Sequence, residues 1–514
     1  MNIYSPGQID YIIEQSLGRT ADRRMAFIRC VGAEVAAAVA ALRRKNKRVV
    51  IFAGNDINGA YAMEAGAELA RLEFKPEVYL INIGGDRLTP DSRTAREEYI
   101  AAAGEDALFE TTGMELVQPD LASTDIVVEG LFGREHDGPL MGGYQYLARF
   151  INESGAFVVA IDLPAGMTVD LSVGMINRNI IHANITLTLV GPSAAFFMKE
   201  NAELVGRWEV LDVPLDEEAL KATKCHTRLI EAHNVRKLLP ERGEFVSKAD
   251  LGHALLYAGS YGMLGAAVLS ARGALRSGCG KLTVHGPRCG FFVLQTSVPS
   301  AMFMTDGGDM DIRRMDYSKT YSAIGVGPGI GTSDATVAAL EGLLKAANAA
   351  AGPLVLDADA LNCISLRPSM LDFIPARSVI TPHEGEFDRL FGKQPSSSAR
   401  LLKAIEISRK LSIIVVLKGH YTATVWPDGS VLLNSSGTPA LATAGSGDVL
   451  TGLITGLIAS GMHPEYAAVT GVYVHGLAGH FAARTQGVRS VTAADVADCI
   501  GQGFEAIVNQ KKQS

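Results

Sequence analysis

The sequence predicts an α/β protein of two domains, each built around a parallel β-sheet. Three observations support this prediction. A chain of 514 residues is too long for one ordinary hydrophobic core. Apolar stretches of strand length alternate with helical stretches along both halves of the chain. Most of these strand-like stretches end in glycine or another turn residue, as is typical of doubly wound sheets.

The first half opens with an alanine-rich amphipathic helix within residues 24–45. Helical stretches such as GGYQYLARFINES separate the apolar strands that come after it. The predicted strands and their turns are RVVIFAG (48–54), EVYLINIGG (77–85), DIVVEGLFG (125–133), AFVVAIDLPAG (156–166) and NITLTLVGP (184–192). Strands that alternate with helices form a parallel sheet, and ligands bind at the carboxyl ends of its strands.

Residues 213–247 are polar, charged and poor in glycine, so we place a domain boundary near residue 225, between domains 1–225 and 226–514. A second alternating series follows. A helix of small residues, GAAVLSARGALRSG (265–278), is suited to close packing against its own sheet or against a neighbouring subunit. The predicted strands are HALLYAGS (253–260), KLTVHG (281–286), YSAIGVGPGIG (321–331), GPLVLDADAL (352–361), SVITPHEGEF (378–387), SIIVVLKGHYTATVW (412–426) and the hairpin strand DGSVLLNSS (428–436).

The composition indicates a folded protein of the cytoplasm. Hydrophobic residues make up 47% of the chain and charged residues 20%. A net charge of −8 argues against a general nucleic-acid or membrane-surface partner. No apolar run approaches the roughly 18 residues of a membrane span, and the first residues lack a signal-peptide pattern. Six cysteines form no CxxC pair, which excludes the common zinc and redox motifs and suits a reducing compartment.

The stretch Thr443–Ala459, TAGSGDVLTGLITGLIA, combines a flexible turn with the start of an apolar helix. Gly445 and Gly447 bracket Ser446, and free backbone N–H groups at such a helix start favour an anion. Asp448 follows, where a carboxylate beside a phosphate site takes a proton from a hydroxyl or merely caps the helix. The segment by itself leaves both interpretations open.

Four glycine-bearing loops follow predicted strands of the second half. They are AGSYG (258–262), GVGPGIG (325–331), LKGHYT (417–422) and AGSGD (444–448). Each one alone is compatible with an ordinary tight turn. Because the strands of one parallel sheet bring their loops to the same rim, a phosphate-bearing ligand on that rim is the better interpretation.

Charged residues near these loops have two interpretations each. Lys418 is a phosphate-binding point charge or a solvated strand-end lysine, and His383 is a substrate or proton-transfer group or an ordinary polar residue. Carboxylates in the second half either hold a hydrated magnesium ion or are exposed acids at helix starts. These carboxylates are Glu384, Glu386 and Asp388, with Asp357 and Asp359 open to the same two interpretations.

Six segments in fixed order carry a family resemblance for the second half. GSYGMLGAAVLSARGALRSGCGKLTV, VGPGIG, LDADALN, TPHEGEFDRL, LKGHYT and AGSGDVLTG resemble the ADP- or ATP-dependent NAD(P)H-hydrate dehydratases, which have a ribokinase-like fold. The resemblance extends from about Val235 to the last helix. It implies dehydration of the S form of hydrated NADH or NADPH, with ADP converted to AMP and phosphate. ADP (or ATP) and Mg²⁺ are the implied cofactors. We also expect a homo-oligomer.

The resemblance assigns roles residue by residue. Asp448 is implied to be the catalytic carboxylate beside the substrate hydroxyl. The residues implied to bind the hydrated nicotinamide nucleotide are Ala266, Gly327, Gly329, His383 and Asp448. Those implied to bind the adenine nucleotide are Lys418, Gly419, His420, Tyr421, Thr422, Gly445, Ser446 and Gly447.

The first half resembles the Rossmann-like, three-layer NAD(P)H-hydrate epimerase domain through RVVIFAG, VVEGLFG, AIDLPAG and TLTLVGP. It departs from that family at four places, one of which is the first-helix region RMAFIRC, which lacks the family's methionine-glutamate motif. GNDINGAY (54–61) lacks the double glycine and the aspartate of the family loop, Glu129 replaces an aspartate that holds K⁺, and Ala165 replaces a serine ligand of the same ion. The resemblance still implies Glu129 as the candidate ligand of a K⁺ ion in this domain. Asp162, which the resemblance implies is the proton-transfer carboxylate, is retained.

These departures favour a degenerate domain with a structural or assembly role over an active epimerase. Asp162 by itself is also compatible with a strand-end aspartate that caps the PAG turn. Two rival functions stay open for the whole chain. One is a ribokinase-like kinase that phosphorylates a small vitamin-type alcohol. The other is a nucleotide-binding scaffold in which both halves have lost catalysis.

Overall fold

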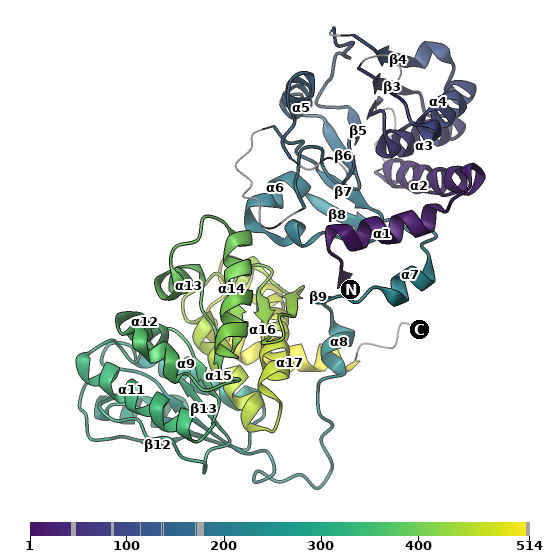
Figure 1. Ribbon diagram of the computed structural model, residues 1–514. Helices are drawn as coiled ribbons and strands as arrows, with labels where there is room; N and C mark the ends of the chain where they lie inside the picture. Colours follow the sequence, from purple (N-terminus) through teal and green to yellow (C-terminus); the bar gives the residue numbers. More distant parts are fainter. Residues whose placement is uncertain are drawn as a thin grey trace. The chain divides into compact units, whose positions relative to one another are not determined.

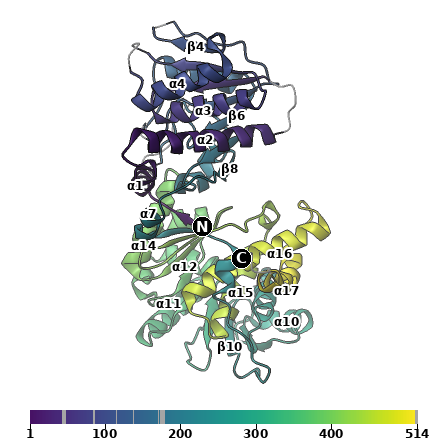
Figure 2. The ribbon, with the colours of Figure 1, turned by 90° about the vertical axis from the view of Figure 1, so that its right-hand side faces the viewer.

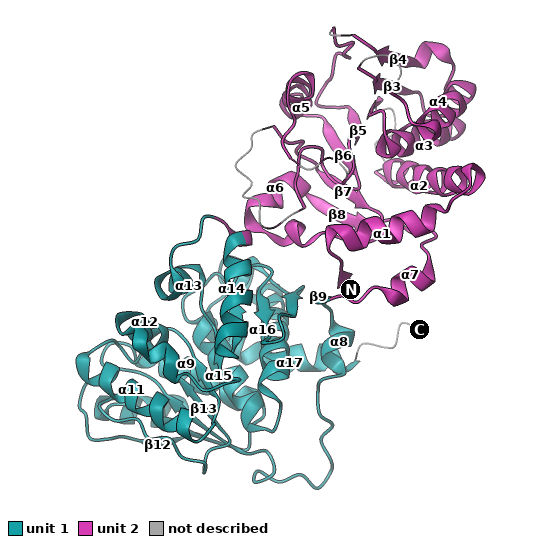
Figure 3. Ribbon diagram, in the orientation of Figure 1, with its two compact units in different colours: residues 1, 226–395, 399–514 teal, residues 2–225, 396–398 magenta. Residues whose placement is uncertain are grey.

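The computed structural model divides the chain into two compact units (Figure 3). Unit 2 consists of residues 2–225 and 396–398, and unit 1 of residue 1 with 226–395 and 399–514. The structure describes residues 1–42, 48–83, 87–113, 115–134, 136, 138–169, 171 and 179–509. Within this described part, no helix is both long enough and apolar enough to cross a membrane.

Unit 2 contains a seven-stranded sheet in the order β4-β3-β2-β5-β6-β7-β8. Every neighbouring pair in this sheet is parallel, as the alternation of strands and helices predicts. Its strands are β2 (Val49–Ala53), β3 (Pro76–Ile81), β4 (Leu108–Thr111), β5 (Ile126–Gly130), β6 (Phe157–Ile161), β7 (Ile185–Thr188) and β8 (Arg207–Val210), and the short β1 (Asn2–Ile3) lies outside this sheet.

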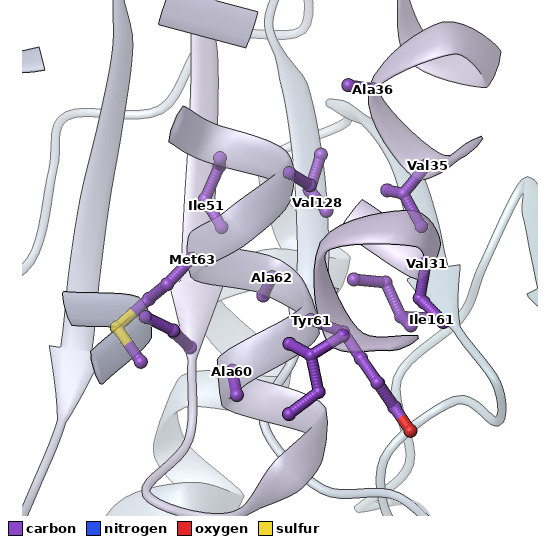
Figure 4. Close-up of a cluster of buried hydrophobic side chains, with 14 of the residues drawn as sticks. Val31, Val35, Ala36, Ile51, Ala60, Tyr61, Ala62, Met63, Val128 and Ile161 are labelled. Atoms are coloured by element: carbon purple, nitrogen blue, oxygen red, sulfur yellow. The ribbon is translucent and has the colours of Figure 1, made fainter. Parts of the chain in front are cut away.

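Helices cover both faces of this sheet, so unit 2 has three layers. In β2, Val49, Ile51 and Ala53 pack with α2 and α3 on one face, whereas Val50 and Phe52 pack with α5 on the other. Figure 4 shows the first of these clusters, and α3 and α4 lie side by side in both ribbon views (Figures 1 and 2). The helices are α1 (Pro6–Leu17), α2 (Ala21–Ala41), α3 (Ile57–Arg71), α4 (Pro90–Ala103), α5 (Gly143–Glu153), α6 (Ala202–Val205) and α7 (Glu217–Ala222).

The sheet of unit 1 is mixed. Its order from β9 onward is β9-β18-β17-β16-β15-β14-β13-β10-β11-β12, and only β17 runs antiparallel to its two neighbours. The strands are β9 (Thr227–Ile230), β10 (His253–Tyr257), β11 (Lys281–His285), β12 (Met302–Met304), β13 (Ala323–Val326), β14 (Leu354–Leu356), β15 (Val379–Ile380), β16 (Ile414–Leu417), β17 (Ala423–Val425) and β18 (Val431–Asn434). The predicted hairpin is confirmed, because β17 and β18 pair directly.

Two helices of unit 1 pack with backbones almost in contact. A Cβ atom on Gly452 would lie 1.8 Å from the carbonyl oxygen of Ser270, and one on Gly273 would lie 2.2 Å from that of Val449. The small-residue helix 265–278 therefore packs within its own unit, against the helix that follows the AGSG turn. The helices are α8 (Ala232–Arg236), α9 (Leu264–Arg276), α10 (Phe291–Ser297), α11 (Asp334–Ala349), α12 (Asp359–Leu366), α13 (Glu384–Phe391), α14 (Ser397–Leu411), α15 (Ser446–Ala459), α16 (Pro464–Gln486) and α17 (Ala493–Asn509).

Five parallel strands of unit 1 deliver their carboxyl ends to one edge of the sheet. β10, β13, β14, β15 and β16 are consecutive neighbours, all running in the same direction. The residues after them come from the loops 258–262, 327–331, 357–359, 381–383 and 418–422. The fold therefore gathers three of the four predicted glycine loops on one rim.

Candidate functional site

An ion pair joins two strand ends at this rim. Asp357 directly follows β14 and Lys418 directly follows β16, and Lys418 Nζ lies 2.9 Å from Asp357 Oδ1. Thr451 Oγ1, on α15, donates a hydrogen bond of 2.5 Å to the other oxygen of Asp357. Glu386 Oε2 lies 3.7 Å from Lys418 Nζ. Lys418 is therefore held in place by carboxylates from two other segments.

These carboxylates decide the charge of Lys418. Burial opposes the ammonium charge, but Asp357 and Glu386 outweigh it and hold the pKa of Lys418 above its ordinary value. The side chain is therefore a fixed cation on the rim. It is not the solvated strand-end lysine of the alternative interpretation, since only 21% of its side chain is exposed.

Asp448 lies in the first turn of α15, beside this cation. The helix is capped by Gly445, whose φ of +88° is in the left-handed region, so Asp448 is not the capping residue. Burial, followed by the negative charge of Asp357, raises the pKa of Asp448 to about 7, while Lys418 acts in the opposite direction. A carboxylate whose pKa is close to neutrality is suited to accept and release a proton.

A pocket of about 380 Å³ opens on one side of Lys418 and the α15 turn. Six of the predicted nucleotide-binding residues line it, whereas Tyr421 and Gly445 do not. A Cβ atom on Gly447 would lie 3.4 Å from Lys418 Nζ, so the glycine leaves the helix start open beside the cation. The predicted residues in its lining are Lys418, Gly419, His420, Thr422, Ser446 and Gly447.

The residues predicted to bind the nicotinamide nucleotide do not line this pocket. Three of them are nevertheless brought together with the rim. A Cβ atom on Gly329 would lie 3.0 Å from Ala266 Cβ, so these two predicted residues are adjacent. Gly327 packs against Asp357, because a Cβ atom there would lie 1.8 Å from the Asp357 carbonyl oxygen.

His383 is the N-cap of α13. Its Nδ1 accepts hydrogen bonds from the backbone N–H groups of Gly385 and Glu386, at 3.0 and 3.3 Å. Its side chain is 54% exposed, and Nε2 lies 3.4 Å from Glu386 Oε1. The histidine thus has a capping role in this structure and still presents its ring to solvent near the rim.

The acidic triplet beside His383 does not converge on one point. Asp388 forms a bidentate pair with Arg400, and Glu384 lies 3.9 Å from the same guanidinium. Glu386 turns instead to Lys418 and to the backbone N–H of His383. Among the described residues no cluster of three or more His, Cys, Asp or Glu side chains is arranged to hold a metal. The three acids therefore do not form a shared magnesium site.

In unit 2, Asp162 follows β6 and forms a buried ion pair. Arg134 Nε lies 3.1 and 3.0 Å from the two carboxylate oxygens of Asp162. Thr188 Oγ1 lies 3.5 Å from Asp162 Oδ1 and accepts a hydrogen bond of 3.2 Å from Arg134 Nη2. Among the described residues, the Asp162 carboxylate therefore contacts Arg134 and Thr188, and it does not cap the backbone of the PAG turn.

Glu129 is fully buried at the end of β5. Its two carboxyl oxygens accept backbone hydrogen bonds from Leu131, at 2.8 Å, and from Ala165, at 3.1 Å. Burial raises the pKa of Glu129 to about 8. A potassium ion needs several available oxygen ligands, but here the carboxyl oxygens are engaged and Ala165 has no hydroxyl group. The residues present therefore do not fit the expected K⁺ site.

Three residues at the two sites were not predicted. Thr451 lies one helical turn after Gly447, so helical periodicity contains the signal that places it on the same face as the α15 turn. His475, in α16, lines the pocket; its Nε2 has no hydrogen-bond partner among the described residues, and burial lowers its pKa to about 4. Neither His475 nor Arg134 is adjacent in sequence to a predicted site residue, and only the fold brings them there.

Two family models match the chain. One, described as NAD(P)H-hydrate dehydratase, matches residues 254–502, and the other, described as YjeF-related protein N-terminus, matches residues 25–195. The matched ranges fall in unit 1 and unit 2 respectively.

Curated relatives match over most of their length. A bifunctional NAD(P)H-hydrate repair enzyme of Moorella thermoacetica is 33% identical over 468 residues, covering 88% of this chain and 86% of the relative. One of Mycobacterium tuberculosis is 31% identical over 430 residues, covering 82% and 80%. Among solved structures, the ADP/ATP-dependent NAD(P)H-hydrate dehydratase of Bacillus subtilis, co-crystallised with ATP and Mg²⁺, is 30% identical, covers 54% of this chain and 98% of its own, and has a TM-score of 0.46.

Proposed function

The chain belongs to the bifunctional NAD(P)H-hydrate repair enzymes, and from this premise we propose that unit 1 dehydrates the S form of hydrated NADH or NADPH at the expense of ADP. The protein is an enzyme of the lyase class and carries an NAD(P)H-hydrate dehydratase domain. The products are NADH or NADPH, AMP and phosphate.

The observation that carries this proposal is the position of Asp448. It lies in the first turn of α15, next to the Lys418–Asp357 pair, with a pKa of about 7. A hydroxyl on the hydrated ring is a poor leaving group in water. Asp448 accepts its proton as the oxygen attacks the terminal phosphorus of ADP, and AMP leaves. The phosphorylated hydrate then loses phosphate and a ring proton, which restores the double bond.

Two positively charged or polarised groups stabilise the negative charge that develops during this transfer. Lys418 is a fixed cation, and the backbone N–H groups at the start of α15 point out of the helix beside it. Phosphoryl transfer depends mainly on such positioning and charge stabilisation. The pocket lined by Lys418, Thr422 and Gly447 is the proposed place of the adenine nucleotide.

Magnesium fits this site only together with the nucleotide. No three side chains of the described residues form a metal cluster, whereas Mg²⁺ commonly binds through substrate phosphates, water and one or two carboxylates. On the rim, Asp448 lies in the first turn of α15 and Glu386 Oε2 lies 3.7 Å from Lys418 Nζ, and these are the two carboxylates that would face a metal bound with the phosphates. When bound, the metal supplies additional charge neutralisation of the phosphates. The chain's own contributions are the base, the lysine and the amide groups.

For unit 2 we propose a structural role, without epimerisation of the R and S hydrates. Two observations support it. The Asp162 carboxylate is engaged with Arg134, and the Glu129 carboxyl group is engaged with backbone N–H groups. A group that transfers protons to a ligand has to be accessible to it, and the side chain of Asp162 is only 5% exposed.

A repair assay with separated S and R hydrates tests the proposal. Purified protein with the S hydrate, Mg²⁺ and either ADP or ATP is followed by the return of the absorbance of reduced nicotinamide. We expect recovery with ADP and the S hydrate. If absorbance recovers neither with ADP nor with ATP, the proposed reaction is contradicted. Recovery with ATP alone would show that the enzyme consumes ATP in place of ADP. Phosphorylation of a small vitamin-type alcohol in its place would support the rival kinase function.

The variant Asp448→Asn separates catalysis from binding. We expect kcat to fall by a factor on the order of 10² or more, because the base is lost, with nucleotide affinity largely retained. Since the pKa of Asp448 is raised on folding, its ionisation costs stability as the pH rises through about 7. The variant should therefore unfold at the same or a higher temperature than the wild type at pH 8. Unchanged turnover would show that Asp448 is not the base.

A further inference from the structure

Arg134 has no role in the dehydration proposed above, yet it is one of the most buried charged side chains of unit 2. The residue is 9% exposed and its side chain only 3% exposed. It lies in the loop after β5, and it reaches the end of β6, where Asp162 follows the strand. An arginine in such a place needs a compensating charge, and Asp162 supplies it.

The two loops are held in fixed relation. Asn58, near the start of α3, donates hydrogen bonds from Nδ2 to the carbonyl oxygens of Phe132, at 2.9 Å, and Ile161, at 3.2 Å. Phe132 lies two residues before Arg134, and Ile161 directly precedes Asp162. One buried amide therefore joins the segment that carries the arginine to the segment that carries the carboxylate.

The backbone at Asp162 adds to this constraint. Its φ of +64° is in the left-handed region, which a non-glycine residue adopts only when its surroundings hold it there. Its backbone N–H donates a hydrogen bond of 2.7 Å to Leu187. The carboxylate is thus directed to one place, and Arg134 and Thr188 occupy that place.

The ion pair is not arranged for greatest stability. Arg134 Nη1 is buried and has no hydrogen-bond partner among the described residues. A buried donor without a partner costs free energy, and a buried ion pair seldom exceeds an apolar pair of similar volume in stability. In this arrangement the guanidinium group of Arg134 neutralises the charge of Asp162 and covers its carboxylate.

We propose that Arg134 is the residue that withholds Asp162 from proton transfer, so that unit 2 contains a blocked epimerase carboxylate which the removal of one side chain makes available. This inference rests on the proposed function of unit 2, and it names the cause of the lost activity. Arg134 is a positioning residue here, acting on the hydrate only through Asp162.

The test measures interconversion of the R and S hydrates by chromatography, with the full-length protein and no adenine nucleotide, so that unit 1 does not contribute. We expect the wild type to show only the spontaneous rate. Arg134→Ala should accelerate interconversion by roughly tenfold or more, within the range of general acid–base catalysis, and the double variant R134A/D162N should lose this gain. A stable Arg134→Ala variant without any gain overturns the proposal.

Two controls make the result specific. Arg24→Ala breaks another arginine–aspartate pair of unit 2, with Asp91, and should leave the rate at the spontaneous level. Dehydration of the S hydrate with ADP should be the same in the wild type and Arg134→Ala. Absence of dehydration in both proteins would contradict the proposed function of unit 1. The inference on Arg134 is decided separately, by the interconversion assay without nucleotide.

A second measurement needs no variant, since removing one partner of a buried ion pair can prevent folding. The native wild type is treated with a water-soluble carbodiimide and an amine, and each carboxyl group is followed by mass spectrometry. We expect Asp162 to be modified only after unfolding, whereas an exposed carboxylate such as Glu217 reacts in the native protein. Modification of Asp162 at the rate of Glu217 overturns the proposal.

Discussion

At the scale of single residues, Lys418 sets the electrostatics of the unit 1 rim, where it lies among several carboxylates. Lys418 contacts Asp357 directly, lies within 3.7 Å of Glu386 and lowers the pKa of Asp448 against the effects of burial and of Asp357. The balance of these charges sets the pKa of Asp448 at about 7. Two predictions follow from this balance, one on pH and one on the lysine.

The rate of dehydration should depend on pH through Asp448. The residue accepts a proton only when ionised, so kcat/KM should rise with pH and level off above about pH 7. Steady-state rates between about pH 5 and about pH 9 check this. A profile that stays flat through neutrality would mean that Asp448 ionises well below pH 7 or that another group is the base.

Lys418→Met should move the acidic limb of that profile to higher pH. Without the lysine, the negative charges of Asp357 and Glu386 are no longer balanced, and the pKa of Asp448 rises further. We also expect a higher KM for ADP, because the phosphates lose a positive partner. Lys403→Met, which removes a lysine paired with Glu406 on the surface, is the matched control. An unshifted limb in Lys418→Met would contradict this account of the rim.

At the scale of elements, the helix that begins at the AGSG turn is positioned by its glycines. Gly452 meets the backbone of Ser270, so α9 and α15 approach more closely than larger residues permit. The sequence predicted a helix of small residues at 265–278 and left its packing partner open. The partner within the chain is α15, and this packing fixes the helix start that carries Ser446, Gly447 and Asp448.

Gly452→Ala should destabilise unit 1 and lower activity. The added Cβ atom would lie 1.8 Å from the Ser270 carbonyl oxygen, so α9 and α15 must separate, at a cost of about 1–3 kcal/mol. Thermal unfolding and kcat measure the two effects. Gly342→Ala in α11 is the control, because nothing lies within 4 Å of its added Cβ atom, and we expect a small stabilisation there. Equal unfolding temperatures for the two variants would contradict the close packing.

The strands next to the sites were predicted well, and the edge strands of unit 2 were missed. β2, β5, β6 and β7 coincide with apolar runs because central parallel strands are buried on both faces. β4 and β8, at the two edges of the same sheet, read LFET and RWEV, without a continuous apolar run. A half-exposed edge strand carries a weaker sequence signal. The last residues of the predicted helix 24–45 and of the predicted stretch 77–85 lie outside the described residues.

At the scale of the whole molecule, the chain folds as two units with separate sheets and separate cores. Scanning calorimetry of the full-length protein should therefore show two transitions. With ADP at about 100 times its Kd, the transition of unit 1 should move up by roughly 5–10 °C, because binding adds about 2.7 kcal/mol to its stability. The transition of unit 2 should stay in place. Equal shifts of both transitions would contradict a nucleotide site confined to unit 1.

The two candidate sites differ in how far the sequence could predict them. Around Asp448, the ordered loops and TPHEGEF indicated the rim, and Lys418, Gly447 and Asp448 do lie together there. In unit 2, the sequence showed the departures at Glu129 and Ala165 and left the role of Asp162 open. Arg134, which covers Asp162, comes from another loop 28 residues earlier and carries no local pattern that marks it.

The sequence by itself determined the fold class, the two alternating strand–helix series and the order of the motifs, because these depend on local periodicity and turn chemistry. Only the tertiary structure decided which charges face one another. It placed Lys418 against Asp357 and raised the pKa of Asp448, and it closed Arg134 over Asp162. The physical reason is that burial and electrostatic pairing depend on distances across the sheet, between residues whose separation along the chain carries no information about contact.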